Sequence, residues 1–172
     1  DSSTSRGLGD VYKRQNKPRG YLSAMSDDHG RPCVGDIVAD RIRAGQRLFH
    51  VGRLDQDTEG LLLLTNDGEL AHRLMHPSYE VPKTYLATVR GVMGQREARK
   101  LRQGIDLDDG PISADELQII DKLDGKTLVR VVVHEGRNRI VRRMLAEIGF
   151  PVIELVRTQL GRVALGNQRS GS

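Results

Sequence analysis

Acidic side chains recur at alternate positions in the segment Gly-Arg-Leu-Asp-Gln-Asp-Thr-Glu-Gly, which covers residues 52–60. Asp55 stands apart from Asp57 and Glu59 because it follows an apolar strand pattern and has Arg53 beside it in sequence. A carboxylate at a strand end next to an arginine can stay ionised in a partly buried cleft and serve as a nucleophile or base. Asp57 and Glu59 fit solvated turn positions at least as well as a functional role.

The same acids resemble the start of a calcium loop, which places oxygen ligands at alternate positions before a glycine. The twelfth position of such a loop would be Asn66 instead of Glu, and the four residues after Gly60 are all leucine. A loop that buries four leucines cannot also wrap an ion with oxygen ligands, so we reject a calcium site.

His72 and His76 are four residues apart on an expected helix, which is the spacing of a zinc-binding pair. The zincin pattern requires Glu after the first histidine, but Arg73 stands there, and no third ligand is evident nearby. We interpret both histidines as surface or capping residues and expect no metal site.

Four arginines stand close together before and within another expected helix, namely Arg137, Arg139, Arg142 and Arg143. The apolar residues of this helix define a buried face, and Arg139 and Arg143 lie on the opposite, solvent side. Arg142 lies about 100° from Val141, at the margin of the buried face, where it can pair with a semi-buried carboxylate. A solvated, charged helix face explains the same pattern equally well.

Lys83 and Tyr85 project to the same side of an expected strand because they are two residues apart. A tyrosine that packs on the sheet is the ordinary interpretation. In a chain with only 3% aromatic residues, a tyrosine beside a lysine is also a reasonable stacking surface for one flipped-out base.

The composition fits a globular protein with a polyanionic partner. The 172 residues carry a formal net charge of +4, and the sequence pI is about 9.5, which favours nucleic acid without proving it. No apolar run reaches the roughly 20 residues of a membrane span, and the N-terminus has no secretory-signal pattern. The single cysteine, Cys33, excludes an internal disulfide and suits a reducing cytoplasm.

Short strands and helices must position these residues. Apolar periods and glycine or proline stops predict helices that begin near Pro32 and that cover 69–75, 95–103 and 138–148. They predict strands at 47–51, 61–64, 83–90, 114–120, 127–133 and 152–161. This order predicts an α+β fold class, with a mostly antiparallel mixed sheet and flanking helices. Residues 1–15 and 166–172 have no usable apolar period, so we expect a flexible or non-native leader and a flexible tail.

Several of these segments together resemble the RsuA/RluB-type pseudouridine synthases. Asn16 to Gly20 is similar to the opening strand of that family, and residues 51–68 are similar to its signature nearly residue for residue. Pro82 to Tyr85 resembles its base-stacking strand, and residues 135–144 resemble its third motif. The similarity covers about residues 16–165, which we expect to form the catalytic domain.

The resemblance implies a pseudouridine synthase-like domain with a central cleft that isomerises uridines in RNA without a cofactor. Asp55 would be the catalytic nucleophile, Arg142 its paired arginine, and Tyr85 the residue that stacks on the target uracil. Arg53 would fill the space left by the flipped base, and Val141 would line the uracil pocket. The base must leave its stack because C5 of a stacked uridine is not accessible. The aspartate would act either on the sugar or on C6 of the ring.

The resemblance also implies the partner. We expect a cytoplasmic monomer that acts on ribosomal RNA at a stem-loop, with the large subunit favoured over small-subunit RNA and transfer RNA. Lys83, Arg137, Arg139 and Arg143 would contact this RNA. Arg139 and Ile140 replace a His-Gln pair of many relatives, which adds positive charge.

Two further expectations concern affinity and alternatives. Nothing before Asn16 resembles the S4-type RNA-binding domain that many relatives carry, so we expect weaker binding to naked RNA. The main alternative is a non-catalytic RNA-binding module that uses the same basic surface. That alternative gives no reason for the carboxylate of Asp55 in a phosphate-binding cleft. A metal-dependent hydrolase would need ligands that the sequence does not offer.

Overall fold

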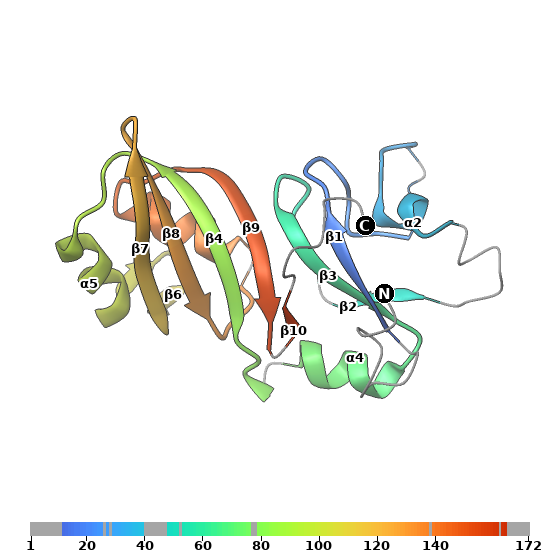
Figure 1. Ribbon diagram of the computed structural model, residues 1–172. Coiled ribbons are helices and arrows are strands. Elements are labelled where there is room, and N and C mark those ends of the chain that lie inside the picture. The colour runs from blue at the N-terminus through green and yellow to red at the C-terminus, as the bar shows by residue number, and fades with distance from the viewer. Residues whose placement is uncertain are drawn as a thin grey trace. The chain divides into compact units, whose positions relative to one another are not determined.

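Antiparallel strands and short helices make up the fold, which confirms the α+β class predicted from the sequence (Figure 1). The computed structural model describes residues 12–25, 27, 29–39, 48–51, 53–76, 79–137, 139–161 and 163–164. The chain divides into two units, one formed by Asp1–Tyr79 with Val163–Ser172 and the other by Glu80–Arg162. None of the helices in these described ranges is long and apolar enough to cross a membrane.

The first unit is built around strand β3 (Glu59–Thr65). It pairs antiparallel with β1 (Tyr12–Lys17) and with β2 (Phe49–Val51). The four leucines of β3 are all fully buried, which confirms the prediction of an apolar strand covered on both faces. The unit also contains α2 (Val34–Ile37), α4 (Gly68–Met75) and β10 (Val163–Ala164).

Strand β1 begins at Tyr12, inside the segment that the sequence assigned to a flexible leader. Its backbone pairs with β3 along its whole length, and Gln15 and Lys17 are fully buried. The boundary at residue 15 was wrong because main-chain hydrogen bonds, and not an apolar side-chain period, hold this polar strand in the sheet. The rest of the predicted leader, the predicted tail and residues 40–47 lie outside the described residues.

The second unit contains an antiparallel sheet with strand order β9-β4-β8-β7. Its strands are β4 (Lys83–Arg90), β7 (Glu116–Leu123), β8 (Lys126–Val133) and β9 (Val152–Leu160). The prediction for β4 is confirmed at both ends, whereas β7 starts and ends later than predicted. Asp124 and Gly125 join β7 to β8, and both have positive φ, as a two-residue hairpin turn requires. This Asp-Gly pair was the available signal for the longer strand.

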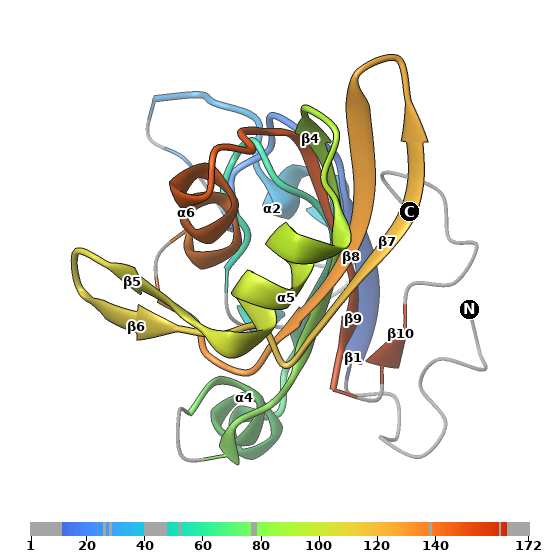
Figure 2. The same ribbon diagram turned by 90° about the vertical axis from the view of Figure 1, so that its left-hand side faces the viewer.

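Helices α5 (Gln95–Gln103) and α6 (Ile140–Glu147) lie on one face of this sheet (Figure 2). The prediction for α5 is confirmed at both ends, and α6 lies within its predicted range. A hairpin of β5 (Ile105–Leu107) and β6 (Gly110–Ile112) was not predicted. Strands of three residues are too short to show an alternating apolar pattern, so only the fold reveals them.

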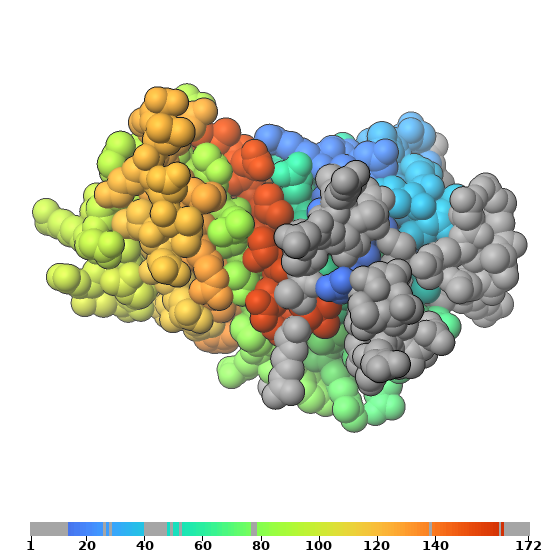
Figure 3. Space-filling model, viewed as in Figure 1, coloured from blue at the N-terminus to red at the C-terminus, as the bar shows by residue number. Residues whose placement is uncertain are grey.

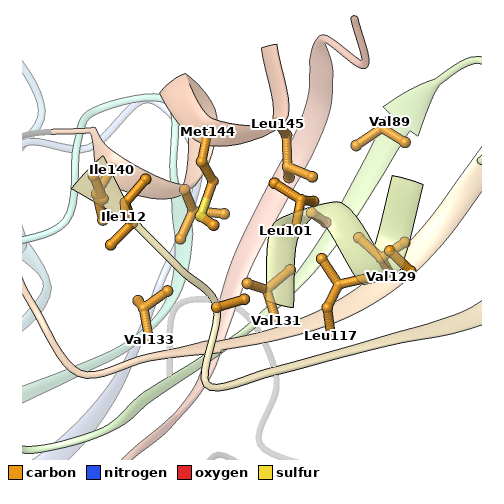
Figure 4. Packing of buried hydrophobic residues seen from close by; sticks show 14 of the residues in the cluster. Val89, Leu101, Ile112, Leu117, Val129, Val131, Val133, Ile140, Met144 and Leu145 are labelled. Carbon is orange, nitrogen blue, oxygen red and sulfur yellow. The ribbon is translucent and has the colours of Figure 1, made fainter. Parts of the chain in front are cut away.

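The hydrophobic core of the second unit lies between these helices and the sheet (Figure 4). Leu101 of α5 and Met144 and Leu145 of α6 are fully buried in the same cluster as apolar residues of β4, β7 and β8. The surface seen in Figure 3 includes side chains of β7 and β8, and Ile120 of β7 is 47% exposed. The helices therefore cover the apolar face of the sheet.

Truncation of one core leucine should measure the strength of this packing. We expect Leu101→Ala to lower the free energy of unfolding by about 2–5 kcal/mol, because it removes buried methyl groups and leaves a cavity. Leu123→Ala is the matched control, since Leu123 is 70% exposed, and it should change stability by less than about 0.5 kcal/mol. Urea unfolding measures both variants, and equal effects would contradict the placement of Leu101 in the core.

Candidate active site

Asp55 lies in the loop of residues 53–58 between β2 and β3, here named the Asp55 loop. Asp55 is half-buried, and Arg53 is exposed. The backbone amide of Thr58 donates to the carbonyl oxygen of Asp55 at 3.0 Å, which closes a turn after the aspartate. The expected nucleophile is therefore presented at the start of a turn.

The residue before Asp55 is held by Ser23. The Ser23 hydroxyl donates to the carbonyl oxygen of Leu54 at 2.6 Å and accepts from the backbone amide of Leu54 at 2.9 Å. Ser23 is 1% exposed and Leu54 is 4% exposed, so both hydrogen bonds are shielded from water. Breaking such bonds is costly because each leaves a buried polar group without a partner. Ser23 therefore fixes the chain on one side of Asp55.

The residue after Asp55 is held by Lys17 and Gly20. The Lys17 ammonium donates to the carbonyl oxygens of Tyr21 at 2.8 Å and Gln56 at 3.3 Å. The backbone amide of Gly20 donates to the Gln56 carbonyl oxygen at 2.6 Å, and the Gln56 side-chain amide donates back to the Gly20 carbonyl oxygen at 3.0 Å. Both chain neighbours of Asp55 are thus tied to the segment of residues 17–23.

Lys17 is fully buried although lysine normally carries a charge. Burial lowers the pKa of Lys17 to about 8, and the negative charges of Asp57, Glu59 and Asp55 oppose this shift. Lysine is almost never fully buried without partners, and here the backbone carbonyl oxygens supply them. Lys17 therefore holds the Asp55 loop, although removal of its ammonium from water is unfavourable.

The stability of the chain should depend on pH through Lys17. The pKa of Lys17 is about 8 in the folded chain, and in the unfolded chain it has the ordinary lysine value of 10.5. Between these two values the unfolded chain binds more protons than the folded chain, so the free energy of unfolding rises with pH, by up to about 3 kcal/mol. We expect Lys17→Met to make this rise smaller, while Lys83, whose pKa is also lowered by burial, keeps its own contribution; urea unfolding between about pH 7 and pH 10 would measure the difference.

Lys122→Met is the matched control for this experiment because Lys122 is exposed on β7. The control variant should keep the whole rise in stability with pH. A Lys17→Met variant that shows the same rise as the unaltered chain would contradict the effect of burial on this lysine.

In the second unit, Tyr85 of β4 and Arg157 of β9 are opposite each other. Opposed residues of antiparallel strands point to the same side of the sheet, here the side on which Tyr85 packs against the core. Arg157 is 3% exposed. The register shifts between Thr84 and Tyr85, and such bulges often re-aim side chains next to functional sites. The expected stacking tyrosine is therefore accompanied by a buried arginine.

Lys83 is half-buried two residues before Tyr85. Burial lowers the pKa of Lys83, the positive charge of Arg157 lowers it further, and the charge of Glu135 opposes both. A Cβ atom at Gly136 would stand 3.6 Å from Lys83 Nζ, so the ammonium lies against this glycine. Two cations beside an aromatic ring suit a nucleotide, which offers both a phosphate charge and a base to stack on.

Sequence reasoning did not select Lys17 or Arg157. Arg157 follows the buried Leu155 at the alternate position of an apolar strand, and Lys17 ends a strand that pairs with the leucines of β3. A charged residue in such a place was the available signal, because charged side chains are rarely buried unless they are paired. The signal indicates that a partner exists but does not name it, since the partner comes from another segment.

Helix α6 carries Val141 and Arg142, and Arg139 is the residue directly before it. Val141 is 2% exposed and belongs to the core cluster, while Arg142 beside it is half-buried, as expected for the margin of the buried face. Arg139 is exposed just before the helix and has a left-handed backbone, with φ of 54°. A left-handed backbone and a positive charge at a helix N-terminus are both unfavourable, so local stability does not explain Arg139.

Arg137 and Arg143 are both bound to Asp109, at the turn of the β5–β6 hairpin. Arg137 Nη1 donates to Asp109 Oδ1 at 3.0 Å, and Arg143 donates from Nη1 and Nη2 to Asp109 Oδ2 at 3.0 and 2.9 Å. Arg137 also donates to Glu135 and to the carbonyl oxygens of Gly110 and Pro111. These bonds engage all five donors of its guanidinium, so Arg137 anchors the hairpin. Arg143 was expected to point to solvent, but its side chain is only 34% exposed.

The histidine pair at the end of α4, namely His72 in the helix and His76 directly after it, lies outside these groups. His72 and His76 are exposed, and their ring centroids lie 4.9 Å apart. Within the described ranges, no group of three or more His, Cys, Asp or Glu side chains could hold a metal ion.

The predicted residues thus fall into two sets. Arg53 and Asp55 belong to the first unit, and the others belong to the second, namely Lys83, Tyr85, Arg137, Arg139, Val141, Arg142 and Arg143. Within the second unit, Lys83 and Tyr85 stand together on β4, and Asp109 joins Arg137 to Arg143. The pairing of Asp55 with Arg142 stays a prediction, because the two residues belong to different units.

Known proteins with similar structure contain the same fold. A solved pseudouridylate synthase superposes with a TM-score of 0.80 at 32% identity, covering 94% of this chain and 68% of that one. Human RNA pseudouridylate synthase domain containing 1 gives a TM-score of 0.62 at 16% identity, covering 87% of this chain and 74% of that one. At this identity the second likeness concerns the fold alone.

Sequence comparisons name the family. An uncharacterized RNA pseudouridine synthase of Mycobacterium tuberculosis (strain ATCC 25618 / H37Rv) is 65% identical over 162 residues, covering 94% of this chain but 64% of that protein. Ribosomal large subunit pseudouridine synthase B of Bacillus subtilis (strain 168) is 44% identical over 163 residues, covering 94% of this chain and 66% of that protein. The chain therefore spans less than two thirds of the mycobacterial relative. The model of the family described as RNA pseudouridylate synthase matches residues 14–147, and this chain belongs to that family.

Proposed function

We propose that the chain isomerises uridine to pseudouridine in RNA and that Asp55 is its nucleophile. The observation that carries this proposal is the support of the Asp55 loop, in which Ser23 holds Leu54 and Lys17 holds Gln56. A catalytic group must be held in one geometry by surrounding bonds, and a loop tied on both sides of a half-buried carboxylate meets this need. Membership of the family supports the same assignment.

The proposed reaction is an isomerisation, so the nucleoside keeps the same atoms while its bonds change. The bond between N1 of uracil and C1′ of the sugar breaks, the base turns, and C5 forms the new bond to C1′. C5 loses its proton and N1 gains one, so the change needs no oxidant, reductant or second substrate. The carboxylate of Asp55 would bond to C1′ or to C6 while the base turns.

The other predicted residues take roles that the family resemblance implies. Tyr85 would stack on the flipped base, Val141 would line its pocket, and Arg53 would fill the gap in the RNA stack. Arg142 would contribute positive charge to the reaction. The bulge beside Tyr85 and the half-buried position of Arg142 support these assignments.

We propose ribosomal RNA as the substrate, with the large subunit favoured. The net charge of +4 supports a polyanionic partner, and the Bacillus subtilis relative is named for the large subunit. Exposed Arg139 and the neighbouring arginines supply cations for phosphate contacts.

Pseudouridine mapping tests both parts of this proposal. The chain would be incubated with separate transcripts of large-subunit, small-subunit and transfer RNA, and pseudouridines would be located by carbodiimide modification and reverse transcription. We expect one or a few modified sites in the large-subunit transcript. Modification of another RNA alone would overturn the substrate, and no modification of any of them would overturn the activity.

A further inference from the structure

The Asp109 bridge, defined as Arg137, Asp109 and Arg143, suggests how this chain receives RNA. Asp109 offers one carboxylate oxygen to Arg137 and the other to Arg143. A phosphodiester also presents two oxygens, both bonded to the phosphorus atom, that share one negative charge. Arginine forks bind carboxylates and phosphates in the same manner. We propose that Asp109 occupies the place of an RNA phosphate and is displaced when RNA binds, an inference that rests on the proposed function.

The bonds of Arg137 explain why a binding site would remain after Asp109 leaves. Besides Asp109, its guanidinium is held by Glu135 and by the carbonyl oxygens of Gly110 at 3.1 Å and Pro111 at 2.6 Å. These contacts do not involve the Asp109 carboxylate, so they keep the guanidinium in place. A cation that is already oriented loses little freedom when a ligand binds.

Gly110 is part of the same arrangement. A Cβ atom at this position would lie 3.4 Å from Arg137 Nη1, and the backbone φ of Gly110 is 126°, which favours glycine. A side chain at this position would strain the backbone, so glycine favours the approach of the turn to Arg137.

Exposure and charge explain why Asp109 can be exchanged. Its side chain is 46% exposed and that of Arg143 is 34% exposed, so water and salt screen their attraction. The charges of Arg137 and Arg143 balance those of Asp109 and Glu135. A phosphate in the place of Asp109 keeps the charge bonded to the two arginines the same, whereas removal of the Asp109 charge by substitution leaves an excess of +1 that attracts RNA.

A binding experiment with matched variants tests the proposal. The probe is a labelled oligouridylate of about 20 nucleotides, and the affinity is measured by fluorescence anisotropy over a range of salt concentrations. We expect Asp109→Ser to bind the probe about threefold to tenfold more tightly than the unaltered chain near 0.1 M salt. The slope of log affinity against log salt should steepen by up to about one, because no displaced carboxylate then takes up a cation when RNA binds.

Asp108→Ser is the matched control because it removes the same charge from the neighbouring position of the same turn. Asp108 is exposed and makes no ion pair with any described residue. We expect this variant to change affinity by less than about twofold. An equal gain from both variants would show a general charge effect and would overturn the proposal, as would an unchanged or weaker affinity of Asp109→Ser.

The Asp109→Ser substitution made in an Arg143→Gln chain shows whether the gain in affinity comes from freeing Arg143 or from a change in the structure of the hairpin. In an Arg143→Gln chain, the gain from Asp109→Ser should shrink to the part that comes from Arg137, and an undiminished gain would overturn the proposal. Thermal unfolding would identify a misfolded variant, and Asp109→Ala then takes its place. Pseudouridine mapping on the same preparations keeps the two proposals apart: modification without the Asp109 effect overturns this inference alone, and the Asp109 effect without modification overturns only the proposed isomerisation.

Discussion

An Asp55→Asn variant is expected to form pseudouridine at least about a thousandfold more slowly than the unaltered chain, a loss of about 4 kcal/mol of transition-state stabilisation. The amide has nearly the shape of the carboxylate but lacks its charge and its nucleophilic oxygen. The contacts of Ser23, Gly20 and Lys17 reach the backbone of Leu54 and Gln56, so the loop should keep its shape. Single-turnover rates on a modified transcript measure the effect.

Asp57→Asn is the control for this variant, because it removes the same charge from the same loop. We expect the Asp57→Asn variant to retain isomerisation within about tenfold, because Asp57 lies in the turn after Asp55. The negative charge of Asp57 also lowers the cost of burying charged Lys17. RNA binding should remain within about threefold for both variants. Undiminished isomerisation by the Asp55→Asn variant would contradict the assignment of Asp55 as the nucleophile.

Arg142→Ala should slow the reaction by about a hundredfold, with a much smaller effect on RNA affinity. Arg142 is half-buried at the edge of the core, next to Val141, which is 2% exposed. A charge in such surroundings acts more strongly on a nearby reacting group than an exposed charge does. Single-turnover rates at saturating and subsaturating enzyme separate the effect on the chemical step from the effect on binding.

Arg143→Ala is the comparison, because Arg143 is the next residue on the same helix but pairs with Asp109. We expect it to weaken RNA binding by about threefold and to flatten the salt dependence, with little effect on the rate at saturation. The loss should be modest because Asp109 already neutralises Arg143 in the free chain. Equal effects of both variants on binding alone would contradict the different roles of the two arginines.

Several elements could be predicted from the sequence because their signals are local. Strand β4 and helix α5 begin and end at the predicted residues, since each has a clear period and a glycine directly after it. The buried strand β3 followed from its four leucines. The position of Arg142 at a helix margin followed from its spacing to Val141. Such patterns depend on a few neighbouring residues, so one sequence contains them in full.

Other features could not be predicted because they depend on partners far away in the chain. Lys17 reaches Gln56 across 39 positions, and Ser23 reaches Leu54 across 31. Neither lysine nor serine carries a sequence signal for such a partner. Residues 12–15 of the polar strand β1 carry no local signal for the same reason, since the strand is stabilised by its pairing with β3.

The sequence by itself determined the family and singled out Asp55, because a motif of consecutive residues carries both. Only the tertiary structure decided which partners the arginines bind and which hydrogen bonds hold the loop of Asp55. Arg137 and Arg143 look equally available in the sequence, yet a hairpin of three-residue strands brings Asp109 to both of them. The physical reason is that motifs are read along the chain, whereas hydrogen bonds and ion pairs form wherever folding brings donors and acceptors within about 3 Å of each other.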